Sequence, residues 1–345
     1  MGGVPELRSG LATLPAVQPA RSVPEALGLV FCGRSLPTVP VLPVAGSTLL
    51  AQVCGAFAGV TEYAVGRMRV DPNAFGVSPA DALSTDGDAF GALHEALAGW
   101  SNAAVRERAE AVRVDMLGPV TIAVTLMEAG VPRATALDAA RMAAAYRSEA
   151  LFGAWRAVEE HLPVVVVMFE PRLVGSAHPT FPLTGREVRS LLDPVVDALD
   201  TAAGTSDVVI GVQVPGRCDL RTVISSGISM LCIPPDASVV GWAHWIQALL
   251  DNGGHVAWGA VPVDRPLGTN AELLWRHLSA IWRDLAAAGV DSESLVRRSL
   301  VTPGDALDGF APAQVPGVVS LLDALGERVA ESAAAHRVPR LVPVP

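Results

Sequence analysis

Hydrophobic residues recur along this chain as short continuous runs that alternate with longer segments of helical spacing. The clearest run is P-V-V-V-V-M-F-E-P-R-L at residues 163–173, which is apolar on both of its alternating faces up to Glu170. Such a run is typical of a parallel strand that is covered on both sides. Pro171 has no N–H to continue the ladder, so the strand is predicted to end with Glu170 at its carboxyl end.

The same pattern predicts eight strands, each followed by a helix or by a segment of helical length. The predicted strands cover residues 11–14, 60–68, 111–117, 163–170, 207–214, 228–233, 255–261 and 298–302. The predicted helices cover residues 23–31, 47–58, 89–110, a segment from about 121, 135–161, 184–203, 219–227, 239–252, 270–289 and 315–335. In the helix at 184–203, Thr184 and Glu187 have the spacing of a capping box.

Eight βα units in 345 residues predict an α/β fold, a single (β/α)8 TIM barrel. We expect one domain over residues 1–345, with its core at about 10–335. A proline-rich segment precedes that core, and a proline-rich tail at 336–345 follows it.

The composition narrows the class of protein without changing this fold. Half of the residues are hydrophobic, yet no stretch approaches the roughly 18 apolar residues of a spanning helix, so no membrane segment is expected. A net charge of −10 argues against nucleic acid, which needs a basic face. The first residues lack the layout of a secretion signal, and the four cysteines form no C-x-x-C pair, which favours a cytoplasmic, reduced protein.

The carboxyl ends of barrel strands are where functional sites lie, so the polar residues there are the candidates for chemistry. Thr13, Glu170, Gln213 and Asp305 occupy such positions. For Glu170 a structural role is an equally open alternative, in which the carboxylate ties down a loop through hydrogen bonds.

Five segments at these strand ends occur in a fixed order along the chain. They are G-P-V-T-I-A at 118–123, F-E-P-R-L at 169–173, G-V-Q-V-P-G at 211–216, W-G-A-V-P at 258–262 and L-V-T-P-G-D-A-L at 300–307. In this order they resemble the catalytic barrel of the cobalamin-independent methionine synthases, over residues 10–330 approximately. The resemblance extends to the wider group that contains uroporphyrinogen decarboxylase and zinc methyltransferases.

The resemblance implies a zinc ion held by His, Cys, Glu and Cys, which activates the homocysteine thiol for attack on a methyl-folate. This chain departs from that ligand set. The H-x-C pair is replaced by Q-V-P at Gln213, the strand that should end in Glu reads M-L-C-I-P-P around Cys232, and the cysteine turn reads T-P-G-D at Asp305. The family's D-E-P segment keeps Glu170 but has Phe169 for the Asp, and its G-S-x-P segment reads A-T-L-P at Thr13.

A rebuilt zinc site is the alternative to loss of the metal. It would draw on Cys218, Cys232 and Asp305, with either His178 or His255 as the fourth ligand. Free cysteines in α/β cores are more often small buried hydrophobic residues than ligands.

We therefore expect a divergent methionine-synthase-like protein that binds a small thiol, amino-acid or folate-type ligand at the barrel mouth. It would bind no cofactor and would lack zinc-dependent methyl transfer. Glu170 is the predicted catalytic residue, and Thr13, Glu170, Gln213 and Asp305 are the predicted substrate-binding residues.

Two other functions stay open. One is an active methyltransferase, from methyl-folate to homocysteine or another thiol, with the rebuilt metal site. The other is a non-catalytic barrel that serves as an interaction or regulatory subunit. In that case the apolar segments 39–44 and 341–345 are candidate docking strips for a protein partner.

Overall fold

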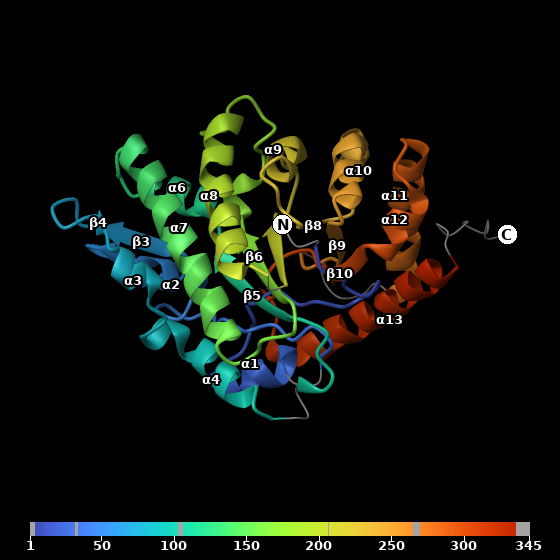
Figure 1. Ribbon diagram of the computed structural model, residues 1–345, viewed down its shortest axis with the longest axis horizontal. Coiled ribbons are helices and arrows are strands. Elements are labelled where there is room, and N and C mark those ends of the chain that lie inside the picture. Colours follow the sequence, from blue (N-terminus) through green and yellow to red (C-terminus); the bar gives the residue numbers. More distant parts are fainter. Residues whose placement is uncertain (1–3, 32–33, 103–105, 206, 265–269, 336–345) are drawn as a thin grey trace.

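Six parallel strands form one curled sheet at the centre of the molecule (Figure 1). The computed structural model describes residues 4–31, 34–102, 106–205, 207–264 and 270–335. In the sheet the strands follow chain order: β5 (Val112–Leu117), β6 (Val164–Phe169), β7 (Val208–Gln213), β8 (Met230–Ile233), β9 (His255–Val261) and β10 (Ser299–Pro303). Each of these six strands was predicted from the sequence, within one or two residues at most ends.

The predicted eight-stranded barrel is wrong, because the first two predicted strands do not join this sheet. Over the described ranges the parallel sheet has six strands. Residues 11–14 contribute one isolated bridge, between Ala12 and Val301 of β10. Residues 60–68 belong instead to an antiparallel hairpin of β2 (Val60–Ala64) and β3 (Arg67–Val70). Gly66, with a φ of 71°, supplies the left-handed residue that this tight turn requires.

Two extended segments from the first 41 residues lie along the edges of the sheet in place of strands. The Thr13 amide donates to the Val301 carbonyl at 2.9 Å, and the Val39 amide donates to the Arg113 carbonyl of β5 at 2.9 Å. The two segments also meet, at Val17 and Val41. The prolines at positions 15, 37 and 40 cannot donate to a ladder, which limits the pairing to isolated bridges.

The first candidate docking strip, 39–44, is therefore mostly covered. Val39 and Val41 are buried, and Val44 is 50% exposed. The second strip, 341–345, lies outside the described residues.

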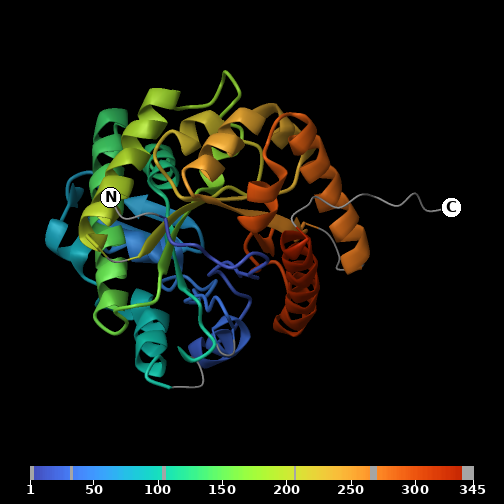
Figure 2. The same ribbon diagram turned by 45° about the vertical axis from the view of Figure 1, so that its right-hand side comes forward.

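Helices run around the outside of the curled sheet, from green α6 and α7 to red α13 (Figure 2). They are α6 (Pro119–Glu128), α7 (Arg133–Arg156), α8 (Gly185–Ala203), α9 (Leu220–Ile224), α10 (Ala243–Asp251), α11 (Ala271–Ala287), α12 (Ser292–Arg297) and α13 (Val315–Ala334). A smaller amino-terminal part holds α1 (Val23–Val30), α2 (Leu49–Cys54), β1 (Phe57–Ala58), β4 (Gly76–Val77), α3 (Pro79–Leu83) and α4 (Gly91–Gly99). No helix in the described ranges has both the length and the hydropathy of a membrane span.

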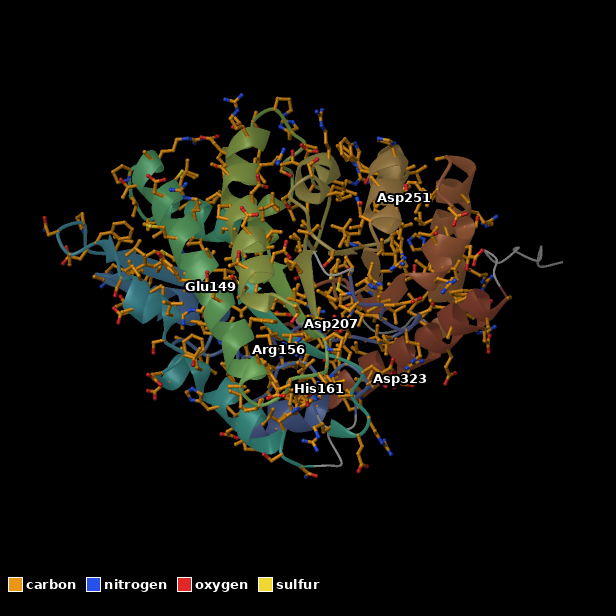
Figure 3. All side chains as sticks on the ribbon, viewed as in Figure 1. Glu149, Arg156, His161, Asp207, Asp251 and Asp323 are labelled. Carbon is orange, nitrogen blue, oxygen red and sulfur yellow. The ribbon has the colours of Figure 1, made fainter. Side chains whose placement is uncertain are left out.

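The Arg156 side chain of α7 binds backbone carbonyls at the amino-terminal ends of β6 and β7. In Figure 3, Arg156, His161 and Asp207 lie near one another in the lower half of the view. Arg156 donates to the Leu162 carbonyl at 2.8 Å and also to the Asp207 carbonyl, which connects the end of α7 to the starts of β6 and β7. These hydrogen bonds fix the amino-terminal ends of β6 and β7 against α7.

Strand β6 shows how the sheet separates two cores. Val165 and Val167 point inside the curve and pack with Cys232 and Leu300, whereas Val166 and Met168 face the helices. Because side chains alternate along a strand, the residue after Phe169 continues the helix-facing row. That row leads to Glu170.

Candidate functional site

A cavity of about 740 Å³ opens at the carboxyl ends of β7, β8, β9 and β10. Its walls are the loops that follow these strands, together with the start of α11. The side chains most relevant to binding are Arg217, Cys218, Asp236, Trp242, His277 and Asp305. Ligands of α/β proteins bind at this end of the sheet, and the volume falls within the roughly 300–1,000 Å³ of small-molecule pockets.

The floor of the cavity depends on a close approach between the ends of β9 and β10. A Cβ atom at Gly259 would lie 2.8 Å from the Gly304 Cα atom, so only a glycine allows the two backbones to come this close. The approach places Asp305, the next residue, in the cavity wall.

Asp305 is a half-buried carboxylate in this wall. Its Oδ1 atom accepts from the Ala306 amide at 2.7 Å. Burial raises the pKa of Asp305, and the nearby Asp308 carboxylate acts in the same direction, against that hydrogen bond. Within the described part of the chain no basic side chain pairs with Asp305. The carboxylate therefore remains available to a donor from a ligand.

The rim carries a second carboxylate that is already paired. Asp236 accepts from the Ser238 amide at 2.8 Å and forms an ion pair with Arg217, Nε to Oδ1, at 3.1 Å. The Ser238 hydrogen bonds, aided by Arg217, lower the pKa of Asp236 to about 2. Asp236 is thus ionised at physiological pH and fixes the turn that leads to Trp242.

His277 joins α11 to the loop after β8. Its Nε2 atom lies 2.7 Å from the Pro235 carbonyl oxygen, which can only accept, so Nε2 carries the hydrogen. The His277 side chain also lines the cavity.

Glu170, the predicted catalytic residue, is not among the residues that line this cavity. Its side chain is fully buried and accepts from the Val120 amide at 2.9 Å, the Thr121 amide at 2.7 Å and the Thr121 hydroxyl at 2.6 Å. Burial raises the pKa of Glu170 to about 7, although the hydrogen bonds from Thr121 and Val120 oppose the shift. These contacts match the structural alternative, in which the carboxylate holds the first turn of α6.

Gly118 is what lets the carboxylate reach that helix end. A Cβ atom at Gly118 would lie 2.2 Å from the Glu170 Cδ atom. Gly118, directly after β5, therefore leaves the space that the Glu170 carboxylate occupies. Pro119, which follows it, is the first residue of α6, a position that favours proline.

Thr13 and Gln213 come together, but inside the curve of the sheet. The Arg113 guanidinium donates to the Thr13 hydroxyl at 3.1 Å and to the Gln213 Oε1 atom at 2.6 Å. The same guanidinium donates to Asp115 with Nε at 2.6 Å and Nη2 at 2.9 Å, and the Ala16 amide also donates to Asp115. All four side chains of this interior cluster are buried.

Arg113 and Asp115 were missed by the sequence analysis, although a signal was present. V-R-V-D-M places two charges at alternate positions of a strand that was predicted to be buried. Buried charges persist only when they are paired and hydrogen-bonded, so this spacing predicts a pair within the strand.

The alternative zinc ligands are not brought together. Cys232 belongs to the interior core beside Arg113, whereas Cys218 lies in the cavity wall, and burial raises the pKa of each thiol to about 12. His255 begins β9, at the other end of the strand, and His178 is exposed and contacts Thr180. Over the described ranges no group of three or more His, Cys, Asp or Glu residues is arranged to hold a metal ion.

Fold and cavity together define an α/β protein with a ligand-sized pocket at the carboxyl ends of its parallel strands. Comparison with protein-family models gives no match, and comparison with curated proteins gives none. Among solved structures, the chain is similar to a protein of Listeria monocytogenes described as a "Putative Vitamin-B12 Independent Methionine Synthase". The TM-score is 0.48 at 10% identity, over 87% of this chain and 83% of that chain. A likeness this distant carries no argument about activity.

Proposed function

We propose that this protein binds a small molecule with an amino group in the cavity at the ends of β7–β10. The observation that carries the proposal is Asp305, a half-buried carboxylate in the cavity wall with no basic partner in the described part of the chain. A carboxylate in such a place gains most from an N–H donor or an ammonium group of a ligand.

A folate-type molecule suits this cavity better than a free thiol amino acid. The volume of about 740 Å³ is that of a pocket for a cofactor-sized ligand, which an amino acid would fill only in part. Trp242 provides an aromatic surface for a flat ring, and Asp305 can accept from the amino group of a pterin-like ring. The strand-end segments that resemble methionine synthases favour the same class of ligand.

Zinc-dependent methyl transfer is not part of this proposal. Gln213, which stands where the family has H-x-C, is held by Arg113 inside the sheet. Cys232 lies in the same interior beside Arg113. Gln213 and Cys232 thus lie inside the sheet, whereas Pro215 and Asp305 line the cavity, and of these two only Asp305 has a polar side chain.

Isothermal titration calorimetry of the full chain with 5-methyltetrahydrofolate, and separately with homocysteine, tests the proposal. We expect saturable binding of 5-methyltetrahydrofolate and at least tenfold weaker binding by Asp305→Asn. Loss of a hydrogen bond to a charged group costs about 1.5–3 kcal/mol, and about 1.4 kcal/mol corresponds to tenfold in affinity.

The matched control is Asp284→Asn, which removes an exposed carboxylate from α11 outside the cavity lining and should bind as the parent does. If neither ligand binds, or if the Asp305→Asn variant binds as tightly as the parent, the proposal is wrong.

A further inference from the structure

A second depression, a groove of about 650 Å³, lies on the outside of the molecule between α8, α9 and α10. Three of the residues that line it are arginines: Arg186 and Arg189 from α8, and Arg221 from α9. Two carboxylates, those of Asp193 and Asp219, also line it, together with hydroxyl groups and the indole of Trp245. We refer to it as the arginine groove.

Two of these arginines have no acidic partner. In the part of the chain that the structure describes, Arg186 forms neither an ion pair nor a hydrogen bond with another side chain, and Arg221 makes only a cation–π contact, 5.8 Å above the Trp245 ring. Arg189 pairs with Asp193 at 3.2 Å on the exposed surface, where such pairs are weak.

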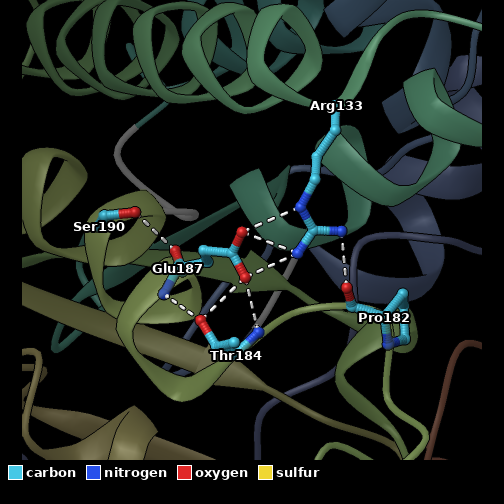
Figure 4. Close-up of polar contacts among 5 residues, drawn as sticks. All are labelled: Arg133, Pro182, Thr184, Glu187 and Ser190. Carbon is cyan, nitrogen blue, oxygen red and sulfur yellow. Dashed lines mark hydrogen bonds and ion pairs between the residues drawn. The ribbon is translucent and has the colours of Figure 1, made fainter.

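The acidic residues nearest in sequence are engaged elsewhere. Figure 4 shows the Glu187 carboxylate, which accepts from the Thr184 amide at 2.7 Å and from the Arg133 Nη2 atom at 2.7 Å. Asp219 lines the groove, but its carboxylate accepts from the Thr222 hydroxyl at 2.7 Å as the cap of α9. Neither carboxylate is free to neutralise Arg186 or Arg221.

The position of the α8 arginines on their helix is also unfavourable in isolation. Arg186 lies in the first turn of α8 and Arg189 in the second, near the helix end where the dipole disfavours positive charge. An anion in the groove would reverse this, because it would interact favourably with the guanidinium groups and with the helix end together.

We propose that the arginine groove binds the dianionic phosphoryl group of a small molecule. Guanidinium groups present paired N–H donors that match phosphate oxygens, and a tetrahedral phosphoryl group can engage donors from two helices at once. The site is a binding site only, and it shares no residue with the cavity that contains Asp305. Its test is independent of the proposed function for that reason.

Titration calorimetry of the full chain with inorganic phosphate, with glycerol phosphate and with glutarate tests this proposal. The double variant Arg186→Gln/Arg221→Gln is compared with Arg67→Gln/Arg141→Gln, in which two exposed arginines remote in sequence lose their charge. We expect saturable binding of a phosphoryl probe that the first double variant weakens at least tenfold and the control leaves unchanged.

The three probes distinguish the sources of the anion. Tighter binding of glycerol phosphate assigns the groove to a phosphate monoester, and equal binding of both phosphoryl probes assigns it to free phosphate. Glutarate bound as tightly as phosphate would overturn the proposal, since the groove would then recognise carboxylates. Absence of saturable phosphoryl binding by the parent, or unchanged binding by Arg186→Gln/Arg221→Gln with a native thermal transition, would overturn it too.

Discussion

Replacing Asp115 with alanine is expected to destabilise the protein by about 3–5 kcal/mol, the typical cost of breaking a buried ion pair from one side. The Arg113 guanidinium is completely buried and donates twice to Asp115. Burial opposes the charged form of Arg113, but the Asp115 carboxylate outweighs this effect and the pKa of Arg113 is raised. Without Asp115, a charged Arg113 would be buried with no counter-charge, which has a high free-energy cost. Urea unfolding followed by circular dichroism measures the loss.

Two comparisons make this result specific. Asp138→Ala removes an exposed partner of Arg141 and should cost about 1 kcal/mol or less. Arg113→Met combined with Asp115→Leu removes both charges and should cost less than Asp115→Ala alone. A loss below about 1 kcal/mol for Asp115→Ala would mean that the interior cluster is not the buried ion pair described above.

Protonation of Glu170 is expected to make the folded protein more stable in mild acid than at neutral pH. Burial raises the pKa of Glu170 to about 7 in the folded protein, from an ordinary value of 4.5. Between these values the folded chain holds the proton and the unfolded chain releases it, so the contribution of Glu170 to stability falls as pH rises. At about 1.4 kcal/mol per pH unit, the effect is about 3 kcal/mol across this window.

The measurement is the difference in unfolding free energy between pH 4.5 and pH 7.5 for the parent and for Glu170→Gln. The glutamine amide does not ionise, so the unfolding free energy of the variant should lack the decrease with pH that Glu170 causes. Altered hydrogen bonds to α6 would lower the stability of the variant equally at both pH values and would leave this difference unaffected. Glu160→Gln, at an exposed position, is the control and should keep the slope of the parent. Equal slopes for the parent and Glu170→Gln would contradict the buried, proton-sensitive environment.

Local signals in the sequence were sufficient for most helices and for six of the strands. The capping box at Thr184 and Glu187 is side-chain chemistry within one turn, and the structure confirms it. The short helix α12 was missed, because it has only six residues between Gly289 and β10.

Local signals could not give the number of strands in the parallel sheet. Residues 11–14 and 60–68 have the composition of strands, but whether a segment joins a sheet depends on partners far away in the chain. Prolines restrict the first segment to one bridge, and the turn at Gly66 folds the second upon itself as a hairpin.

The candidate site was predicted in part. Asp305 does line a cavity at the expected end of the sheet. Glu170 directly follows β6, close to the predicted strand end. The alternation of side chains along the strand directs it toward α6, and the sequence alone could have indicated this. The cavity itself depends on loops after four strands, whose conformations no local pattern specifies.

Hydrogen–deuterium exchange of the full chain, with and without saturating 5-methyltetrahydrofolate, locates the ligand-binding site. We expect slower exchange in the loop 233–242 and around Asp305, with little change at the start of α6 where Glu170 is bound. Protection confined to α6 and Glu170, or no protection near Asp305 in a protein that binds the ligand, would contradict the assignment of the cavity as the binding site.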